Sequence, residues 1–238
     1  MNRNFWVCVA AILIISCGNA WAEGEPNALR FGLAYVMPTG DLSLPFESGG
    51  EDLGDGTMLA FDASLTLEPQ DSPGFTIGYE HRFSGLFGLE AVLLRTTSDI
   101  DGRLQGTFWI NNINSGELIE TGPLDETEEL GDLTFTPLTF GANFHLTRGS
   151  RIDLYVGLFL GFVFYGDLDI EGEKVSMENG FTRGANLGID VPFGEGKWAL
   201  NVALRYQNID AEFDEEGFGG DPIEINPLTL QVGASYRF

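Results

Sequence analysis

Strict alternation of large apolar residues with small or polar ones is the feature that most limits how this chain can fold. From Ile152 to Phe164 every second residue is large and apolar, whereas the positions between them include Asp153, Gly157 and Gly161. Successive side chains of a β-strand point to opposite faces, so the pattern predicts strands with one apolar and one polar face. We predict about eight of them. They are the segments 28–37, 74–83, 86–95, 133–146, 151–165, 181–191, 197–207 and 225–238.

The composition of the second face distinguishes a membrane barrel from a soluble sandwich. A sandwich buries its large apolar side chains against a second sheet, but here the opposite face is built from Gly, Ala, Asn and charged residues. The charged ones are Arg30, Glu80, Arg82, Glu90, Asp153, Asp190, Arg205 and Arg237. Such residues suit the polar, mutually paired interior of a small barrel. The predicted fold is all-β, a transmembrane antiparallel β-barrel in the cell outer membrane.

The connections between the predicted strands also follow the outer-membrane layout. The turns at 84–85, 147–150 and 193–196 are short and the alternate connections are long, which predicts periplasmic turns and extracellular loops. Two loop segments, 58–68 and 103–111, alternate as well, and they predict hairpins that extend the wall beyond the bilayer. Aromatic girdles are expected at both rims. One would hold Phe83, Phe87, Phe144, Trp198, Tyr236 and Phe238, and the other Tyr35, Tyr165 and Tyr206.

The N-terminus has the features of a secretory signal peptide. Arg3 precedes an apolar run from Phe5 to Ile15, and Ala20 and Ala22 form an A-x-A cleavage site. We therefore expect residues 1–22 to be removed and residues 23–238 to form one barrel domain. The pattern before Cys17 also fits a lipid-modified cysteine, which stays open as an alternative.

Acidic charge excludes one class of partner. The formal net charge is −24, and phosphate binding needs Lys and Arg clusters that this chain lacks, so nucleic acid is not an expected partner. The acid is concentrated in the long connections, since residues 38–72 hold eight Asp and Glu and no Lys or Arg. We assign the charge to the extracellular face.

Neither a cofactor nor an enzymatic function is expected. Asp167, Asp169, Glu171 and Glu178 match the spacing of a calcium loop, but the flanks are predicted strands and a chance match is easy in so acidic a chain. His81 and His145 are the two histidines, and we interpret both as polar residues at the periplasmic interface. No catalytic residue is predicted.

Several segments, taken in order, resemble the OmpW family of small outer-membrane barrels, which includes the AlkL-like alkane importers. The opening Arg30-Phe31-Gly32-Leu33-Ala34-Tyr35-Val36 before Pro38 is similar to the family's first strand, and the terminal Phe238 matches its assembly signal. Further matching segments are residues 74–79, 87–90, 136–139, 155–158, 186–190, 206–210 and 226–238. The first and second loops are longer and more acidic than the family pattern.

The resemblance implies passive uptake of small hydrophobic molecules through an apolar channel in the outer half of the barrel, with exit sideways through the wall. We expect Val36, Leu94, Phe159 and Val163 to line that channel, because they are apolar residues on the inward face. Inward charges toward the periplasm would plug the lumen: Arg82, Asp153, Arg205 and Arg237. Pro38 and Pro137 are at the ends of predicted strands, where a missing backbone donor could locally open the ladder, but proline at a strand start is also ordinary.

The expected partners follow from this reading. They are outer-membrane lipid and lipopolysaccharide, the outer-membrane assembly machinery and a small hydrophobic solute. A second reading uses the same residues: the inward apolar side chains simply fill a narrow barrel. The protein would then be a structural or surface-interaction barrel whose acidic loops bind cations, lipopolysaccharide or host ligands.

Overall fold

The computed structural model describes residues 26–40, 42–45, 49–53, 56–83, 86–147, 152–166, 168–170, 173–193, 197–213 and 223–238. The expected signal peptide and Cys17 lie outside these residues, as do Asp167 and Glu171. Within the described part of the chain no helix is long and apolar enough to cross a membrane.

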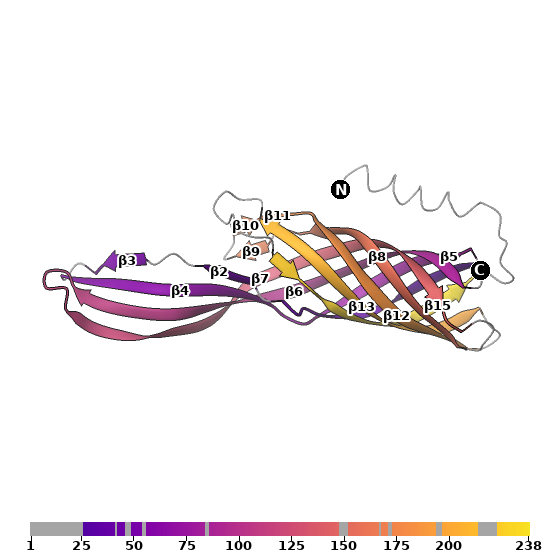
Figure 1. The fold of residues 1–238 in the computed structure, drawn as a ribbon, viewed down its shortest axis with the longest axis horizontal. Helices are drawn as coiled ribbons and strands as arrows, with labels where there is room; N and C mark the ends of the chain where they lie inside the picture. The colour runs from indigo at the N-terminus through magenta and orange to yellow at the C-terminus, as the bar shows by residue number, and fades with distance from the viewer. Residues whose placement is uncertain are drawn as a thin grey trace.

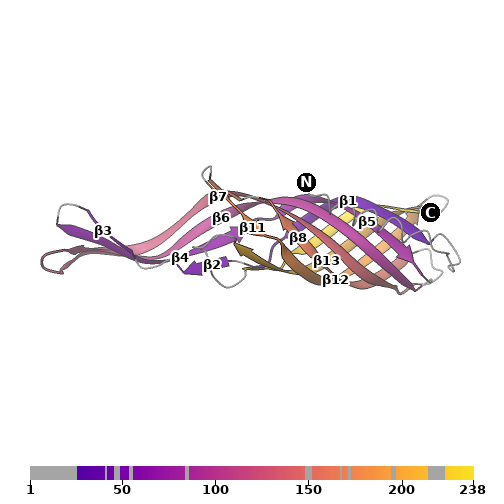
Figure 2. The ribbon, with the colours of Figure 1, turned by 90° about the horizontal axis from the view of Figure 1, so that it is seen from above.

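Eight antiparallel strands form a closed ring (Figures 1 and 2). In ring order they are β1 (Asn27–Met37), β5 (Ser72–Arg82), β6 (Phe87–Asn112), β7 (Leu118–His145), β8 (Asp153–Tyr165), β12 (Gly180–Phe193), β13 (Trp198–Phe213) and β15 (Leu228–Arg237). Pairing of β15 with β1 closes the ring. The prediction of about eight strands is confirmed.

A three-stranded sheet projects from one end of the barrel, and we call it the blade. It consists of β4 (Thr57–Pro69), residues 99–112 of β6 and residues 118–132 of β7. Thirteen rows of paired residues from Thr57 to Pro69 make it about 40 Å long. Figures 1 and 2 show it extending along the barrel axis. The predicted extension of the wall by segments 58–68 and 103–111 is confirmed.

The shorter strands complete the fold at the blade end. β2 (Leu42–Pro45) and β3 (Gly49–Asp52) pair with the outer edge of β4. β9 (Leu168–Ile170) pairs with β10 (Glu173–Val175), while β11 (Met177–Glu178) and β14 (Ile223–Ile225) both pair with β13. β5, β7 and β12 end at the opposite end of the barrel, which we call the turn end and where Phe238 also lies (Figure 1).

The alternation places apolar side chains outside and polar ones inside. Leu33 and Leu158 point outward and are 73% and 72% exposed, whereas Glu80 and Asp190 point inward and are fully buried. This arrangement is the reverse of that in a soluble protein, and it suits a barrel whose outer surface contacts lipid. The turn-end aromatics are exposed on the wall, with ring centroids 5.1 Å apart for Phe87 and Phe144.

The other predicted girdle needs one correction. Tyr35 and Tyr206 are about half exposed on the outer surface. Tyr165, however, packs against buried apolar residues inside. It shares the inward parity of Val163, so the alternation itself places it in the lumen.

Candidate functional site

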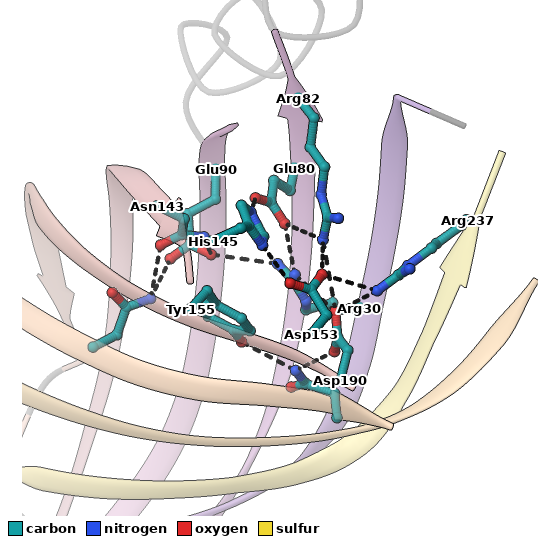
Figure 3. A network of polar contacts seen from close by, with 12 residues as sticks. Arg30, Glu80, Arg82, Glu90, Asn143, His145, Asp153, Tyr155, Asp190 and Arg237 are labelled. Carbon is teal, nitrogen blue, oxygen red and sulfur yellow. Dashed lines mark hydrogen bonds and ion pairs between the residues drawn. The ribbon is translucent and has the colours of Figure 1, made fainter. Parts of the chain in front are cut away.

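The turn-end half of the lumen is occupied by a network of ion pairs that we call the charged layer (Figure 3). Arg30 of β1 lies near its centre. Its Nη2 donates to Glu80 Oε2 at 2.6 Å and to Asp190 Oδ2 at 3.1 Å. These acids come from β5 and β12, so one guanidinium links strands from separate parts of the wall. All three side chains are at least nine-tenths buried.

Three of the four predicted plug residues meet at the carboxylate of Asp153. Arg82 Nη2 donates to Asp153 Oδ2 at 2.7 Å, and Arg237 Nη2 donates to the same oxygen at 3.0 Å. Arg205 is not with them. It lies farther toward the blade, where its Nη1 donates to Glu90 Oε1 at 2.8 Å.

His145 corrects the sequence-based interpretation of an interfacial histidine. Its side chain is 1% exposed and lies between two carboxylates, 2.9 Å from Asp153 and 2.6 Å from Glu80. His81 remains partly exposed and lies 2.9 Å from the side-chain oxygen of Asn27. His145 is two residues from the inward Asn143, so the alternation itself identifies it as an inward residue. The expectation of an interfacial histidine was based on its position near a turn.

Neutral polar side chains complete the charged layer. Asn143 and Asn186 donate to the Glu90 carboxylate at 2.8 and 3.1 Å. Tyr155 lies beneath Arg30, with the guanidinium carbon 4.7 Å from the ring centroid. Phe159 is covered in the same way by Arg205, at 4.2 Å. Phe159 thus forms the boundary of the charged layer.

The charged layer is balanced and tightly filled. It contains four arginines, Arg30, Arg82, Arg205 and Arg237, and four carboxylates, Glu80, Glu90, Asp153 and Asp190. A void of about 20 Å³ beside Tyr155 and Arg205 has room for roughly one water molecule. Buried charges are tolerated only when they are paired and hydrogen-bonded, which these are. The layer therefore obstructs the barrel axis.

Inward glycines provide the space that the charged layer needs. A Cβ on Gly188 would lie 2.2 Å from Cζ of Tyr155, and a Cβ on Gly157 would lie 2.2 Å from Oδ1 of Asn143. Real Cβ atoms do not approach neighbours so closely. Glycine at these two positions lets the large side chains of facing strands cross the lumen.

Above the charged layer, toward the blade, the lumen is closed by apolar side chains that we call the apolar layer. Its members are Ala34, Val36, Leu94, Phe135, Val163 and Ile209, none more than 5% exposed. Val36, Leu94 and Val163 were predicted to line a channel, and the structure brings them together here. Phe159 is separated from them by its contact with Arg205. Phe135 and Ile209 were missed, although their inward parity is the signal that identifies them.

The apolar layer continues onto one side of the blade. Leu67, Ile100 and Leu133 form the next buried cluster. Cross-strand partners share a face of a sheet, and the pairs Leu65↔Leu104, Phe61↔Phe108 and Leu59↔Ile110 extend the lumen-facing side of β4 and β6 outward. We call this surface the apolar face of the blade. The opposite face carries polar pairs, including Ser64↔Gln105 and Asp62↔Thr107.

The wall has one local interruption beside the apolar layer. Pairs between β6 and β7 run up to Leu93↔Leu138 and resume at Thr96↔Phe135, so no pair joins Leu94 to Pro137 or Arg95 to Thr136. Pro137 has no N–H with which to complete that ladder. The prediction that Pro137 is at a strand end is wrong. It lies inside β7, because β7 begins at Leu118. Pro38 does follow the end of β1.

A groove of about 470 Å³ lies in the outer surface of β6, β7 and β8, toward the turn end from Pro137. It is bounded by outward apolar side chains. They include Leu89, Phe140, Ala142, Leu158 and Leu160.

No metal centre is found among the residues that the structure describes, because no three His, Cys, Asp or Glu side chains are grouped to hold an ion. Of the weak calcium candidates, Glu178 is exposed at the end of β11, whereas the side chain of Asp169 lies outside the described part of the structure. Phe238 lies at the turn end, where its amide bonds to Asn27.

Comparisons with known proteins agree with this architecture. The model of the OmpW family matches residues 73–238. The structure of outer membrane protein OprG from Pseudomonas aeruginosa aligns with a TM-score of 0.55 and 17% identity, over 92% of this chain and 99% of OprG. Neisserial surface protein A aligns with a TM-score of 0.52 and 12% identity, over 89% and 97%. AlkL in lipid bilayers has a TM-score of 0.46 and 17% identity, over 93% and 94%. No curated protein matches the sequence.

Proposed function

Because the chain belongs to the OmpW family and is an outer-membrane β-barrel, we propose that it is a channel for the passive uptake of small hydrophobic molecules. A solute would be received by the apolar face of the blade, enter the apolar layer, and leave sideways between β6 and β7. The alternative of a barrel that transports nothing makes opposite predictions for the experiments below.

The observation that carries this proposal is the continuity of the apolar surface. A barrel that only needed a filled lumen would have no reason to continue the apolar side chains of β4 and β6 beyond the membrane. Here the inward side runs from Val36 and Leu94 through Leu67 and Ile100 to Phe61 and Phe108. The apolar side chains of the blade are partly exposed, and apolar surfaces that are left open to solvent commonly mark sites of interaction.

The charged layer argues against an axial route. An apolar molecule crossing it would have to separate the buried pairs around Arg30 and Asp153, and breaking such pairs is expensive. The apolar layer opposes passage far less, because its side chains have no directional partners and can change rotamer. We therefore place the exit at the level of Leu94, where Pro137 interrupts the ladder.

The first test measures uptake of an apolar fluorescent solute into lipid vesicles that contain the purified barrel and lipopolysaccharide. Phe108→Asp places a charge on the apolar face of the blade and should slow uptake severalfold. Thr107→Asp, one residue earlier and on the polar face, is the matched control and should leave the rate unchanged. Uptake no faster than in empty vesicles would overturn the proposal.

A second variant tests the exit. Pro137→Ala restores an N–H where the β6–β7 ladder is interrupted, so it should stabilise that seam and slow uptake. Pro123→Ala in the blade part of the same strand is the control. Equal rates for both variants would contradict a lateral exit at Pro137, while leaving capture by the blade to be judged from the Phe108 result.

A further inference from the structure

We propose that the open edge of β7, from Leu118 to Leu130, is a docking edge for an extended cationic peptide segment. The segment would add to the blade as a fourth strand. This inference is independent of solute transport, because it uses the backbone and carboxylates of the edge and not the lumen.

In the described part of the molecule no strand pairs with this edge of the blade, although β9 lies close to β7. On one side, residues 118–129 pair with β6. On the other side β7 meets β8 only from Phe135 onward, whereas the far edge of β4 is covered by β2 and β3. Unpaired backbone groups on an edge strand are a template for another chain, and addition of a strand is a recurrent mode of peptide recognition. Pro123 is also typical of an edge strand.

The charge along this edge specifies the partner. Residues 118–130 contain five acids and no Lys or Arg. The single base in the blade strands is Arg103, whose Nε and Nη2 donate to Asp125 at 3.0 and 3.2 Å. Opposite charge on a peptide would therefore complement Glu120, Glu126 and Glu128.

The positions of those glutamates favour long basic side chains. Glu120 and Glu126 pair with Ile110 and Leu104 of β6, so they border the apolar face of the blade. Lys and Arg lay their apolar stems along such a surface while their charged ends reach a carboxylate. In an added strand with a basic residue at every second position, all the basic side chains lie on this side of the blade. Their stems then match the apolar face and their charged ends match the carboxylates.

The same charge disfavours the other occupants of an open edge. A second copy of β7 would bring like carboxylates directly opposite each other, which destabilises a strand pair. The phosphates of lipopolysaccharide would be repelled for the same reason. Charged residues that protect an edge from self-association thus leave it available to a cationic strand.

The experiment uses the full-length barrel in lipid nanodiscs and a fluorescent peptide of alternating arginine and valine, about ten residues long. The same peptide N-methylated at every residue keeps the charge but lacks N–H donors. A barrel variant replaces the edge carboxylates by E120Q, E126Q and E128Q. A control variant carries D62N, E68Q and D101N, which change the same charge on β4 and β6.

The proposal predicts saturable binding of the unmodified peptide, at least about fivefold weaker for the edge variant and unchanged for the control variant. Binding of the N-methylated peptide to the unaltered barrel should be at least as weak as binding of the unmodified peptide to the edge variant. Equal binding of the two peptides would show that charge alone accounts for binding, and it would overturn pairing of the peptide with the edge. The absence of binding would also overturn the proposal. Dimers of the unaltered barrel that form through this edge would overturn it in favour of a second copy.

Discussion

The two halves of the lumen are built from the same strands, but they close in different ways. In the charged layer each side chain is fixed by a directional partner on another strand, such as Arg30 with Glu80. In the apolar layer Val36, Leu94 and Phe135 are equally buried but pack into an apolar cluster, and the polar groups beside them are uncharged hydroxyls such as those of Ser72, Thr96 and Thr229. The first is a fixed barrier and the second a deformable one. Under the proposed function, this contrast lets an apolar solute enter from the blade end while the charged layer blocks the axial route.

The largest effect should come from unbalancing the charged layer. Glu80→Gln removes the charge that faces Arg30, Arg82 and His145 in a fully buried site. Breaking a buried pair in this way costs about 3–5 kcal/mol. The free energy of unfolding, measured by urea titration in lipid vesicles, should fall by that amount, whereas Glu68→Gln in the blade should change it little. Similar losses in both variants would show that the charged layer does not hold the barrel together.

Trimming the apolar layer should have two opposite consequences. Leu94→Ala removes buried contacts and should lower the free energy of unfolding by about 2–3 kcal/mol. It should also speed solute uptake, because the deformable barrier becomes thinner. Leu33→Ala, on the outward face of β1 and away from the groove, is the control for both measurements. A variant that is less stable but no faster would separate the apolar layer from transport.

Overfilling the charged layer should lower the free energy of unfolding somewhat less than trimming the apolar layer does. Gly188→Ala places a Cβ against the ring of Tyr155, and adding a methyl group to a filled interior costs about 1–3 kcal/mol. Gly50→Ala is the control, because its Cβ would meet nothing nearer than 3.4 Å. Unchanged stability of the Gly188 variant would mean that the ring of Tyr155 has room to move.

The smallest effect should be the pH dependence at the base of the blade. The hydrogen bond that protonated Asp132 donates to the Asp99 carboxylate, together with the nearby charge of Asp99, raises the pKa of Asp132. The folded blade thus holds a proton more tightly than the unfolded chain. That stabilisation is present below the ordinary aspartate pKa of about 4 and is lost as the pH rises through the raised value.

Amide exchange at the base of the blade, corrected for the intrinsic rate, should accordingly be slower in mild acid than at neutral pH. Asp132→Asn should abolish this difference. The Arg103–Asp125 pair behaves in the reverse sense, because the hydrogen bond from Arg103 lowers the pKa of Asp125 and its contribution is lost only in stronger acid. A blade that becomes less protected in mild acid would contradict the assignment.

The alternation predicted the ring of strands and the identity of the charged layer, because side-chain direction is a local property of a strand. Every inward charged residue named from the sequence, from Arg30 to Arg237, takes part in the network. Which acid meets which base was not predictable, since the tilt and stagger of strands depend on closure of the whole ring. This is why Arg205 pairs with Glu90 instead of joining Asp153.

The boundaries of β7 show a second limit. Residues 118–132 carry acids on both faces and lack apolar alternation, so the strand was predicted to begin at 133. It begins at Leu118 because pairing with β6 continues past the membrane. Pro137 was consequently placed at a strand end, and its position beside Leu94 became visible only from the register.

The most direct test of the account is photolabelling of the lumen with a small apolar diazirine, followed by mapping of the modified residues by mass spectrometry. The account predicts labels on the apolar layer, at residues such as Val36, Leu94 and Phe135, and on Phe108 of the blade. It predicts none on the charged layer around Arg30 and Asp153. Labels confined to the outward wall, or distributed along the lumen through the charged layer, would contradict it.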